Sequence, residues 1–359
     1  MPPTLHIDHL PGRTVQHDGQ EYLFFSGTSY LGLPQHPTYR QLVTDAMTRY
    51  GTVFGASRNG NLRLHIYEEA EAVLARFAAA PAALTVSSGM MAGQLVVQQL
   101  RALRPAFLYA PRVHPALWHE PAPPIPAVSF GEWTSRLPTL LDSVPVDTPV
   151  VLLTNSLDAV RSERYGFDWV QGLPDNRPIW LVVDDSHGLG ITGPGGSGIW
   201  AQLPARPNVT PIVTASLAKA MGLPGGAVLA DADTLADLRR SPFFGACSPI
   251  PPAYLAAFVR AEPLYAGALQ TLRTNVAELE GQLAGLSLFS HEAGYPVFYT
   301  EHDGLYAYLL ARQLLIYSFS YPTPADKPTT RVVVSALHRP EDLTRLANAV
   351  RAFAGLVGR

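Results

Sequence analysis

Short apolar runs recur along the first part of this 359-residue chain, and stretches with apolar residues every three or four positions lie between several of them. Short apolar runs are typical of strands that are buried on both faces of a parallel sheet. A spacing of three to four residues is typical of helices that bury one face. The pattern therefore predicts an α/β fold with a mainly parallel central sheet flanked by helices. Its strands are expected over 82–86, 106–109, 150–153, 180–183, 212–214 and 227–230.

Two helices are predicted from apolar stripes over 39–47 and 64–77. Gly51 follows the first of them and is suited to a C-terminal cap. Beyond residue 250 the pattern changes to longer helical stretches with isolated strands. Helices are expected over 251–286, over 305–314 and from Pro340 onwards, and strands over 297–300 and 331–334.

This change of pattern predicts three parts. Residues 1–35 are expected to form an N-terminal arm, residues 36–240 a large α/β domain, and residues 241–359 a smaller C-terminal α+β domain. The chain is long enough for one large α/β unit and a second, smaller core.

Composition narrows the class of protein. Hydrophobic residues make up 47% of the chain and charged residues 15%, as in compact globular proteins. The net charge of −3 comes without a basic stripe or an acidic tail, so no nucleic-acid partner is expected. No apolar stretch reaches the length that spans a membrane, so no membrane insertion is expected. The single cysteine, Cys247, and an N-terminus without a signal-peptide pattern predict a cytoplasmic protein.

Residues with catalytic potential follow four of the predicted strands, at the positions where α/β sheets bind their ligands. Ser87-Ser88-Gly89-Met90 follows the strand over 82–86 and opens a helix, where free backbone amides favour an anion such as phosphate. An ordinary strand-to-helix turn is the alternative. His114, after the next strand, could stack on a planar cofactor or could simply be solvated.

Two acids and a histidine, Asp184, Asp185 and His187, follow the strand over 180–183. Burying an acid at the end of a strand is costly without a partner, and a cationic ring nitrogen would be such a partner. Acids that cap a helix or a turn are the alternative. The histidines show no HExxH-like spacing and there is no cysteine cluster, so no metal site is predicted.

Lys219 lies in Ser216-Leu217-Ala218-Lys219-Ala220-Met221-Gly222, a run of small and apolar residues. Of the 26 lysine and arginine residues only two are lysines, Lys219 and Lys327. Arginine does not give up its proton in proteins, whereas a lysine shielded from water can become a neutral nucleophile that condenses with an aldehyde. The alternative is a lysine whose amine extends from an apolar loop into water.

In this order, the four motifs resemble those of the fold-type-I enzymes that depend on pyridoxal 5'-phosphate (PLP). More narrowly, the chain resembles the α-oxoamine synthases over nearly its whole length. The narrower resemblance rests on four segments: Ser29-Tyr30-Leu31-Gly32-Leu33, Val183-Asp184-Asp185-Ser186-His187-Gly188, the lysine motif over 216–222, and Arg331-Val332-Val333-Val334-Ser335-Ala336-Leu337-His338.

The resemblance implies a role in catalysis for four residues. Lys219 would form the Schiff base with PLP and would later move protons at the substrate Cα. Asp184 would keep the pyridine nitrogen protonated, which makes the ring an electron sink. His187 would bind the 3'-oxygen of the ring, and His114 would stack on its face.

The resemblance also implies binding residues. The phosphate would be held by Ser88, Gly89, Met90 and Ser216, with Ser248 reaching in from a second subunit. Arg331 and Thr28 are expected to contact the amino acid substrate. Arg331 would bind its carboxylate, a task suited to a planar guanidinium, and Thr28 occupies the place where the family usually has asparagine.

The implied reaction joins an amino acid to an acyl-CoA or acyl-carrier thioester and, with loss of CO2, leaves an α-amino ketone. A homodimer with its active site at the subunit interface is implied as well. An aminotransferase or lyase of the same fold would use the same cofactor residues and is the first alternative. A non-catalytic partner subunit is the second, and the presence of Lys219 argues against it.

Overall fold

The computed structural model describes residues 5–320 and 328–357, so Lys327 lies outside the described residues. The chain divides into two compact units. The first comprises Met1–His36, Asp158–Arg164 and Pro263–Arg359. The second comprises Pro37–Leu157 and Tyr165–Glu262, and we call it the large unit.

The large unit is built on a central sheet, which within the described residues has six strands in the order β3-β10-β9-β8-β5-β4. Every strand predicted from an apolar run before residue 231 is found in this sheet. The strands are β3 (Ala82–Val86), β4 (Ala106–Tyr109), β5 (Val150–Asn155), β8 (Ile179–Asp184), β9 (Val209–Ser216) and β10 (Gly226–Ala230).

The sheet is mainly parallel, as predicted. β4, β5, β8 and β9 pair in parallel, whereas β10 runs antiparallel to both of its neighbours, β9 and β3. β3 therefore runs in the same direction as β9, and the carboxyl ends of five strands meet at one edge of the sheet.

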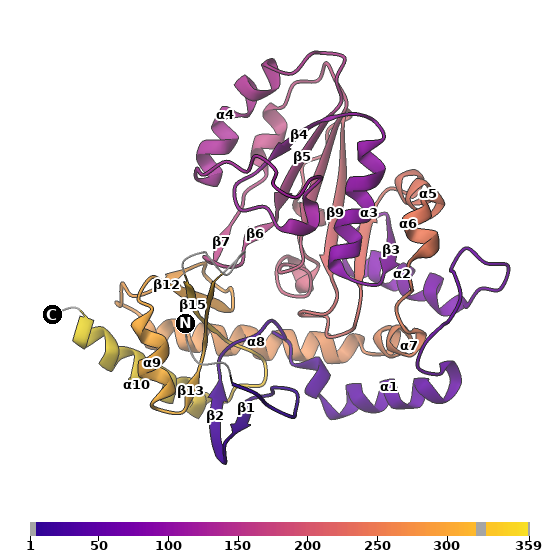
Figure 1. Ribbon diagram of the computed structural model, residues 1–359. Coiled ribbons are helices and arrows are strands. Elements are labelled where there is room, and N and C mark those ends of the chain that lie inside the picture. Colours follow the sequence, from indigo (N-terminus) through magenta and orange to yellow (C-terminus); the bar gives the residue numbers. More distant parts are fainter. Residues whose placement is uncertain (1–4, 321–327, 358–359) are drawn as a thin grey trace. The chain divides into compact units, whose positions relative to one another are not determined.

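Helices cover this sheet. In Figure 1, α3 (Gly89–Arg101) lies against the sheet, where it contacts β9 and β10. Its apolar face packs with strand residues such as Val182, Ile212 and Val228 in one buried core. The other helices of the large unit are α1 (Pro37–Tyr50), α2 (His65–Phe77), α4 (Phe130–Asp142), α5 (Ala232–Arg240), α6 (Pro242–Ala246) and α7 (Pro252–Arg260). Short 3-10 turns complete it: η2 (Pro115–Leu117), η3 (Asp168–Gly172), η4 (Pro194–Gly196) and η5 (Trp200–Gln202).

The end of the large unit differs from the sequence prediction. The predicted boundary near residue 240 moves to Glu262, because α5 contacts β3 and β10, and α7 contacts α1 and α2. The expected arm over 1–35 groups with the C-terminal part of the chain, and so does the short segment Asp158–Arg164.

The other unit combines helices with antiparallel strands. Its three-stranded sheet, among the described residues, has the order β1-β2-β13, and its four-stranded sheet has the order β11-β12-β15-β14. The strands are β1 (Thr14–His17), β2 (Gln20–Phe24), β11 (Ser290–His291), β12 (Val297–Thr300), β13 (Leu314–Leu315), β14 (Tyr317–Ser320) and β15 (Pro328–Val333). The remaining elements are η1 (Leu33–Gln35), α8 (Glu262–Leu283), α9 (Gly304–Leu310), α10 (Pro340–Val357) and the short pair β6 (Leu157–Asp158) and β7 (Glu163–Arg164).

The single helix expected over 251–286 is instead two helices, α7 and α8, which separate at Ala261. Pro263 explains the break, because proline lacks the backbone N–H and its ring clashes with the carbonyl four residues earlier. The helix expected over 305–314 ends at Leu310, and the following residues Leu314–Leu315 pair with β2 instead.

A buried histidine ties the N-terminal arm to the segment after β15. The His338 ring stacks on Phe25 with centroids 4.1 Å apart. Its Nδ1 accepts a hydrogen bond from the Ser335 N–H (2.9 Å), and its Nε2 donates to the Phe24 carbonyl (3.0 Å). Burial lowers the pKa of His338 from its ordinary 6.5 to about 4. The imidazole is therefore neutral in the folded protein at neutral pH.

This histidine predicts a loss of stability in mild acid. As the pH falls below 6.5 the unfolded chain protonates this imidazole, whereas the folded chain does so only near pH 4. Between pH of about 7 and about 5, we expect the free energy of unfolding to fall by about 2 kcal/mol through His338. Urea unfolding at both pH values should show a smaller decrease in the free energy of unfolding for His338→Gln than for wild type. His65→Gln, at an exposed histidine, is the control and should leave the decrease unchanged. Equal decreases in wild type and His338→Gln would contradict this account.

Candidate active site

The predicted cofactor residues gather at the edge of the central sheet where the parallel strands end. β3 ends just before Ser87, β8 ends at Asp184 and β9 ends at Ser216. Register pairs Asn155 with Asp184, and Asp184 with Thr214, so the ends of β5, β8 and β9 lie level. The sequence motifs are therefore neighbours in space as well as successive in the chain.

The two adjacent acids after β8 have different surroundings. Asp184 is only 7% exposed, and its Oδ1 accepts a hydrogen bond from the Ser186 N–H (2.9 Å). Its Oδ2 faces His114, 3.6 Å from Nδ1 of that ring. Asp185 instead accepts from the Ile199 N–H (2.8 Å) and so anchors a loop. Asp184 is the acid that faces the strand-end edge, as the sequence motif implied.

His114 is held at a fixed orientation. Its backbone N–H donates to Asn155 Oδ1 (3.1 Å), and its Nδ1 accepts from the Ala116 N–H (3.1 Å). Burial lowers the pKa of His114, against the opposing effect of Asp184, and the charge of Lys219 lowers it further. The lowered pKa favours the neutral imidazole, and both Asp184 and Lys219 act electrostatically on this ring.

The loop that carries Lys219 is short and tightly bonded. The Leu217 N–H donates to the Gly225 carbonyl (2.9 Å), and the Gly222 N–H donates to the Lys219 carbonyl (3.1 Å). The turn after β8 lies directly against this loop, because a Cβ on Gly190 would approach Ala220 Cβ to 2.8 Å. The half-buried Lys219 thus lies in a loop that its own backbone bonds hold in shape and that packs against the turn after β8.

The predicted phosphate site lies at the N-terminus of α3. Ser88 accepts hydrogen bonds from the Met91 N–H through Oγ (3.0 Å) and from the Ala92 N–H through its carbonyl (3.0 Å). These bonds leave the amides of Gly89 and Met90 at the helix end, where helices have donors without intrahelical acceptors. Such amides suit a phosphate group, so the turn fits this part of PLP.

Because Gly89 has no Cβ, Ser216 can lie closer to the N-terminus of α3 than any other residue at position 89 would permit. A Cβ on Gly89 would lie 2.7 Å from Ser216 Cβ and 2.9 Å from its Cα. Ser216 therefore lies directly against the helix N-terminus, as expected for two residues that hold one phosphate.

Substituting Gly89 should therefore impair phosphate binding. In Gly89→Ala either Ser216 or the turn must shift, and we expect PLP affinity to fall by about tenfold or more, with a stability loss of about 1–3 kcal/mol. PLP titration followed by absorbance would measure this. Gly131→Ala on α4, where an added Cβ meets no atom within 4 Å, is the matched control. Unchanged PLP affinity in Gly89→Ala would contradict the assignment of the turn.

His187 and Ser248 are the two other predicted cofactor residues. His187 is half-buried in the turn three residues after Asp184. Ser248 is exposed and follows Cys247, whose Sγ lies 3.0 Å from Ser87 Oγ. The predicted roles of His187 toward the ring and of Ser248 toward a second subunit stay predictions.

The predicted substrate residues Arg331 and Thr28 belong to the other unit. Arg331 lies on β15 and is 6% exposed, with Nη1 donating to the Ala159 carbonyl (3.1 Å). Its Nε is buried and has no hydrogen-bond partner among the described residues. Thr28 is half-buried in the segment after β2. A buried guanidinium that bonds a backbone carbonyl retains donors for a carboxylate.

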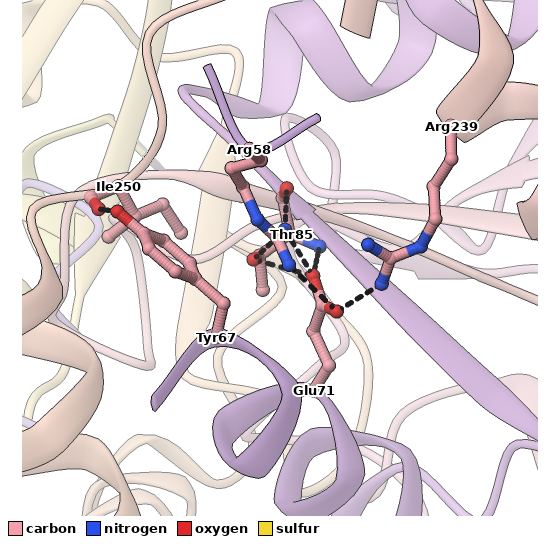
Figure 2. Close-up of polar contacts among 6 residues, drawn as sticks. All are labelled: Arg58, Tyr67, Glu71, Thr85, Arg239 and Ile250. Atoms are coloured by element: carbon pink, nitrogen blue, oxygen red, sulfur yellow. Dashed lines mark hydrogen bonds and ion pairs between the residues drawn. The ribbon is translucent and has the colours of Figure 1, made fainter. Parts of the chain in front are cut away.

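Sequence reasoning did not single out Glu71, which Figure 2 shows bonded to Arg58, Thr85 and Arg239. A signal was present, because Glu71 lies four residues after Tyr67 and three before Leu74, within the apolar stripe of α2. A charged residue in that position is buried and needs partners.

Over residues 5–320 and 328–357, no three His, Cys, Asp or Glu side chains gather as metal ligands would. Each helix within the same ranges is too short or too polar to cross a membrane.

Similar proteins indicate the family of this chain. Residues 169–350 match the family described as aminotransferase class I and II. The chain is 28% identical to 8-amino-7-oxononanoate synthase from Dechloromonas aromatica, over 96% of this chain and 92% of the relative. It is also 28% identical to the enzyme of that name from Cronobacter sakazakii, over 95% and 91% of the two chains.

Solved structures show the same fold. Serine palmitoyltransferase from Sphingomonas wittichii superposes with a TM-score of 0.80 at 17% identity, covering 98% of this chain and 93% of that one. The 8-amino-7-oxononanoate synthase from Francisella tularensis gives a TM-score of 0.70 at 17% identity, over 94% and 98%. The predicted fold-type-I α/β architecture is confirmed. The similarity of the chain to 8-amino-7-oxononanoate synthases over nearly its whole length agrees with the resemblance to the α-oxoamine synthases. The chain belongs to the aminotransferase class I and II family.

Proposed function

We propose that this protein is a PLP-dependent C-acyltransferase that condenses an amino acid with an acyl-CoA or acyl-carrier thioester. A carbon–carbon bond forms between the amino acid Cα and the acyl carbon, the thiol leaves, and loss of CO2 gives an α-amino ketone. The observation that carries the proposal is the gathering of Lys219, Asp184 and His114 beside a phosphate-binding helix end, in a chain similar to 8-amino-7-oxononanoate synthases over nearly its whole length.

The residues of the large unit fit PLP. When bound, PLP supplies an aldehyde and an electron-withdrawing ring that stabilises negative charge on a substrate carbon. Lys219 provides the amine that holds the aldehyde and the base that moves the Cα proton. Asp184, buried and facing the strand-end edge, provides the charge that keeps a ring nitrogen protonated. Ser88, Gly89, Met90 and Ser216 hold the phosphate, and His114 packs against the ring.

Arg331 is proposed to bind the substrate carboxylate. Its guanidinium is buried and already oriented by the Ala159 carbonyl. Arg331→Lys keeps the charge but loses the planar fork, so we expect KM for the amino acid to rise by roughly tenfold to a hundredfold, since charge-assisted bonds are worth about 1.5–3 kcal/mol. KM for the thioester should change little. Steady-state kinetics with each substrate varied in turn would measure both, and a selective rise in the thioester KM would contradict the role.

A substrate screen tests the proposed function directly. Purified protein with PLP would be offered single amino acids together with acyl-CoA and acyl-carrier thioesters of graded chain length, and thiol release and product mass would be followed. The proposal expects thiol release that depends on both substrates and is absent in Lys219→Ala. PLP bound at Lys219 with no thiol release for any pair would instead support the aminotransferase or lyase alternative.

We also propose a homodimer in which Ser248 contributes to the phosphate site of the second subunit. Support comes from the exposure of Ser248 next to Cys247, which contacts the phosphate turn of its own chain. A cytoplasmic location is proposed from the single cysteine.

A further inference from the structure

We infer that Glu71 is a positioning residue that sets the affinity of the large unit for the phosphate group of its ligand. The inference rests on the proposed function, because the ligand in question is PLP. It assigns to Glu71, Arg58 and Thr85 a role in phosphate recognition although none of them belongs to the phosphate-binding turn itself.

Glu71 is the centre of a buried polar cluster shown in Figure 2. Its side chain is 5% exposed, and Oε1 accepts from both the Thr85 N–H (2.7 Å) and the Thr85 hydroxyl (2.9 Å). The two terminal nitrogens of Arg58, Nη1 and Nη2, donate to the Glu71 carboxylate, and Arg239 donates to its Oε2. Arg58 also donates to the Thr85 carbonyl (3.2 Å).

This cluster occupies the free edge of the central sheet. β3 is the last strand in the sheet order, and β10 pairs with its other side. The Thr85 N–H and carbonyl at such an edge have no strand to bond. Glu71 accepts from the N–H and Arg58 donates to the carbonyl, so two side chains take the place of a neighbouring strand. The backbone of Thr85 is thereby fixed on the side that β10 does not reach.

The phosphate turn begins directly after this fixed point. Only Val86 and Ser87 separate Thr85 from Ser88, the N-cap of α3. β10 contacts the turn itself, since a Cβ on Gly226 would lie 2.2 Å from the Ser88 carbonyl oxygen. The turn thus leads away from a fixed Thr85 and packs on β10, so the direction of the Gly89 and Met90 amides is expected to depend on both the Glu71 cluster and β10.

A purely stabilising role does not account for the cluster. Buried ion pairs contribute little net stability compared with well-packed apolar residues of similar size. Arg58 already packs its guanidinium over the Tyr67 ring, 4.4 Å from the centroid, and an apolar side chain could fill the same space. An apolar side chain could not bond the N–H and the carbonyl of Thr85. The polar cluster is therefore explained by its fixing of the Thr85 backbone.

The test compares binding of PLP with binding of pyridoxal, which has the same ring and aldehyde but no phosphate. We expect wild type to prefer PLP, and Glu71→Gln to lose at least about tenfold of that preference, equal to about 1.4 kcal/mol. Pyridoxal affinity should change by less than about threefold, because the ring-binding residues lie at other strand ends. Affinities would be measured by absorbance titration of the full-length protein.

Two further variants separate positioning from folding. The double variant Arg58→Met/Glu71→Met removes the buried ion pair and leaves Arg239, whose side chain is 36% exposed, to water, so it should fold. It still leaves the Thr85 N–H without its acceptor, so the preference for PLP should stay reduced. Leu137→Ala on α4 destabilises the large unit away from β3 and should keep the full preference.

The outcomes separate the inference from the function on which it rests. Wild type that does not prefer PLP over pyridoxal would overturn the proposed cofactor site itself. If wild type prefers PLP, and both Glu71→Gln and the double variant keep this preference, only the role of Glu71 would be overturned. Equal weakening of PLP and pyridoxal in Glu71→Gln would also overturn it, because the effect would then lie in folding.

Discussion

Lys219→Ala should abolish thiol release, lowering kcat by roughly a thousandfold or more, since acid–base and covalent groups each contribute factors of about 10²–10⁴. The expectation follows from the position of Lys219, which lies in a loop against the turn after β8 and close enough to His114 to lower the pKa of that imidazole. Alanine removes both the amine that holds the aldehyde and the base that moves the proton. Single-turnover assays with saturating PLP would measure the chemical step apart from cofactor loss.

Lys219→Arg distinguishes the amine from its charge. Arginine preserves the positive charge but does not give up its proton, so we expect this variant to be as inactive as Lys219→Ala. Arg240→Ala, at an exposed arginine on α5, is the control and should retain activity. Substantial activity in Lys219→Arg would mean that Lys219 supplies only charge, which would contradict its proposed role.

Asp184→Asn should lower kcat by about 10²–10³-fold, the loss seen when one preorganised electrostatic group is removed from an active site. The amide is nearly the same shape as the carboxylate, and its oxygen can still accept the Ser186 N–H that now bonds Oδ1. What it lacks is the negative charge that would keep a ring nitrogen protonated. Measuring kcat together with the midpoint of urea unfolding would show a loss of rate with little loss of stability.

Asp185→Asn provides the contrast for this prediction. Asp185 anchors the Ile199 N–H and lies against Gly188, so its charge serves the loop. We expect Asp185→Asn to lower the unfolding midpoint and to retain most of kcat. Equal losses of kcat in the two variants would refute the distinction between the acids.

Much of the large unit could be predicted from sequence because its strands are buried on both faces. Strands buried on both faces consist of continuous apolar runs, which are easy to recognise in a sequence. The bounds predicted for β3 and β4 are those observed. The boundary at residue 240 was misplaced because α5 to α7 look like helices of either part. Only their packing on β3, β10, α1 and α2 assigns them.

The gathering of most of the predicted cofactor residues at one edge could also be anticipated, because they follow strands and parallel strands end at one edge. Glu71 could not be assigned in this way, because its partners are distant in the chain. Arg239 is 168 positions away, and no local pattern links it to α2. The break between α7 and α8 did have a local cause, Pro263. The prediction followed the continuous apolar pattern and gave this proline too little weight.

The central claim, that the Lys219 amine carries the cofactor, is tested most directly by covalent trapping. Protein incubated with PLP would be reduced with borohydride and digested, and the peptides would be analysed by mass spectrometry. The chain has only two lysines, so the result is unambiguous. The account predicts the added mass of reduced PLP on the peptide that contains Lys219 and none on the peptide that contains Lys327. Added mass on Lys327 alone, or on neither lysine, would contradict it.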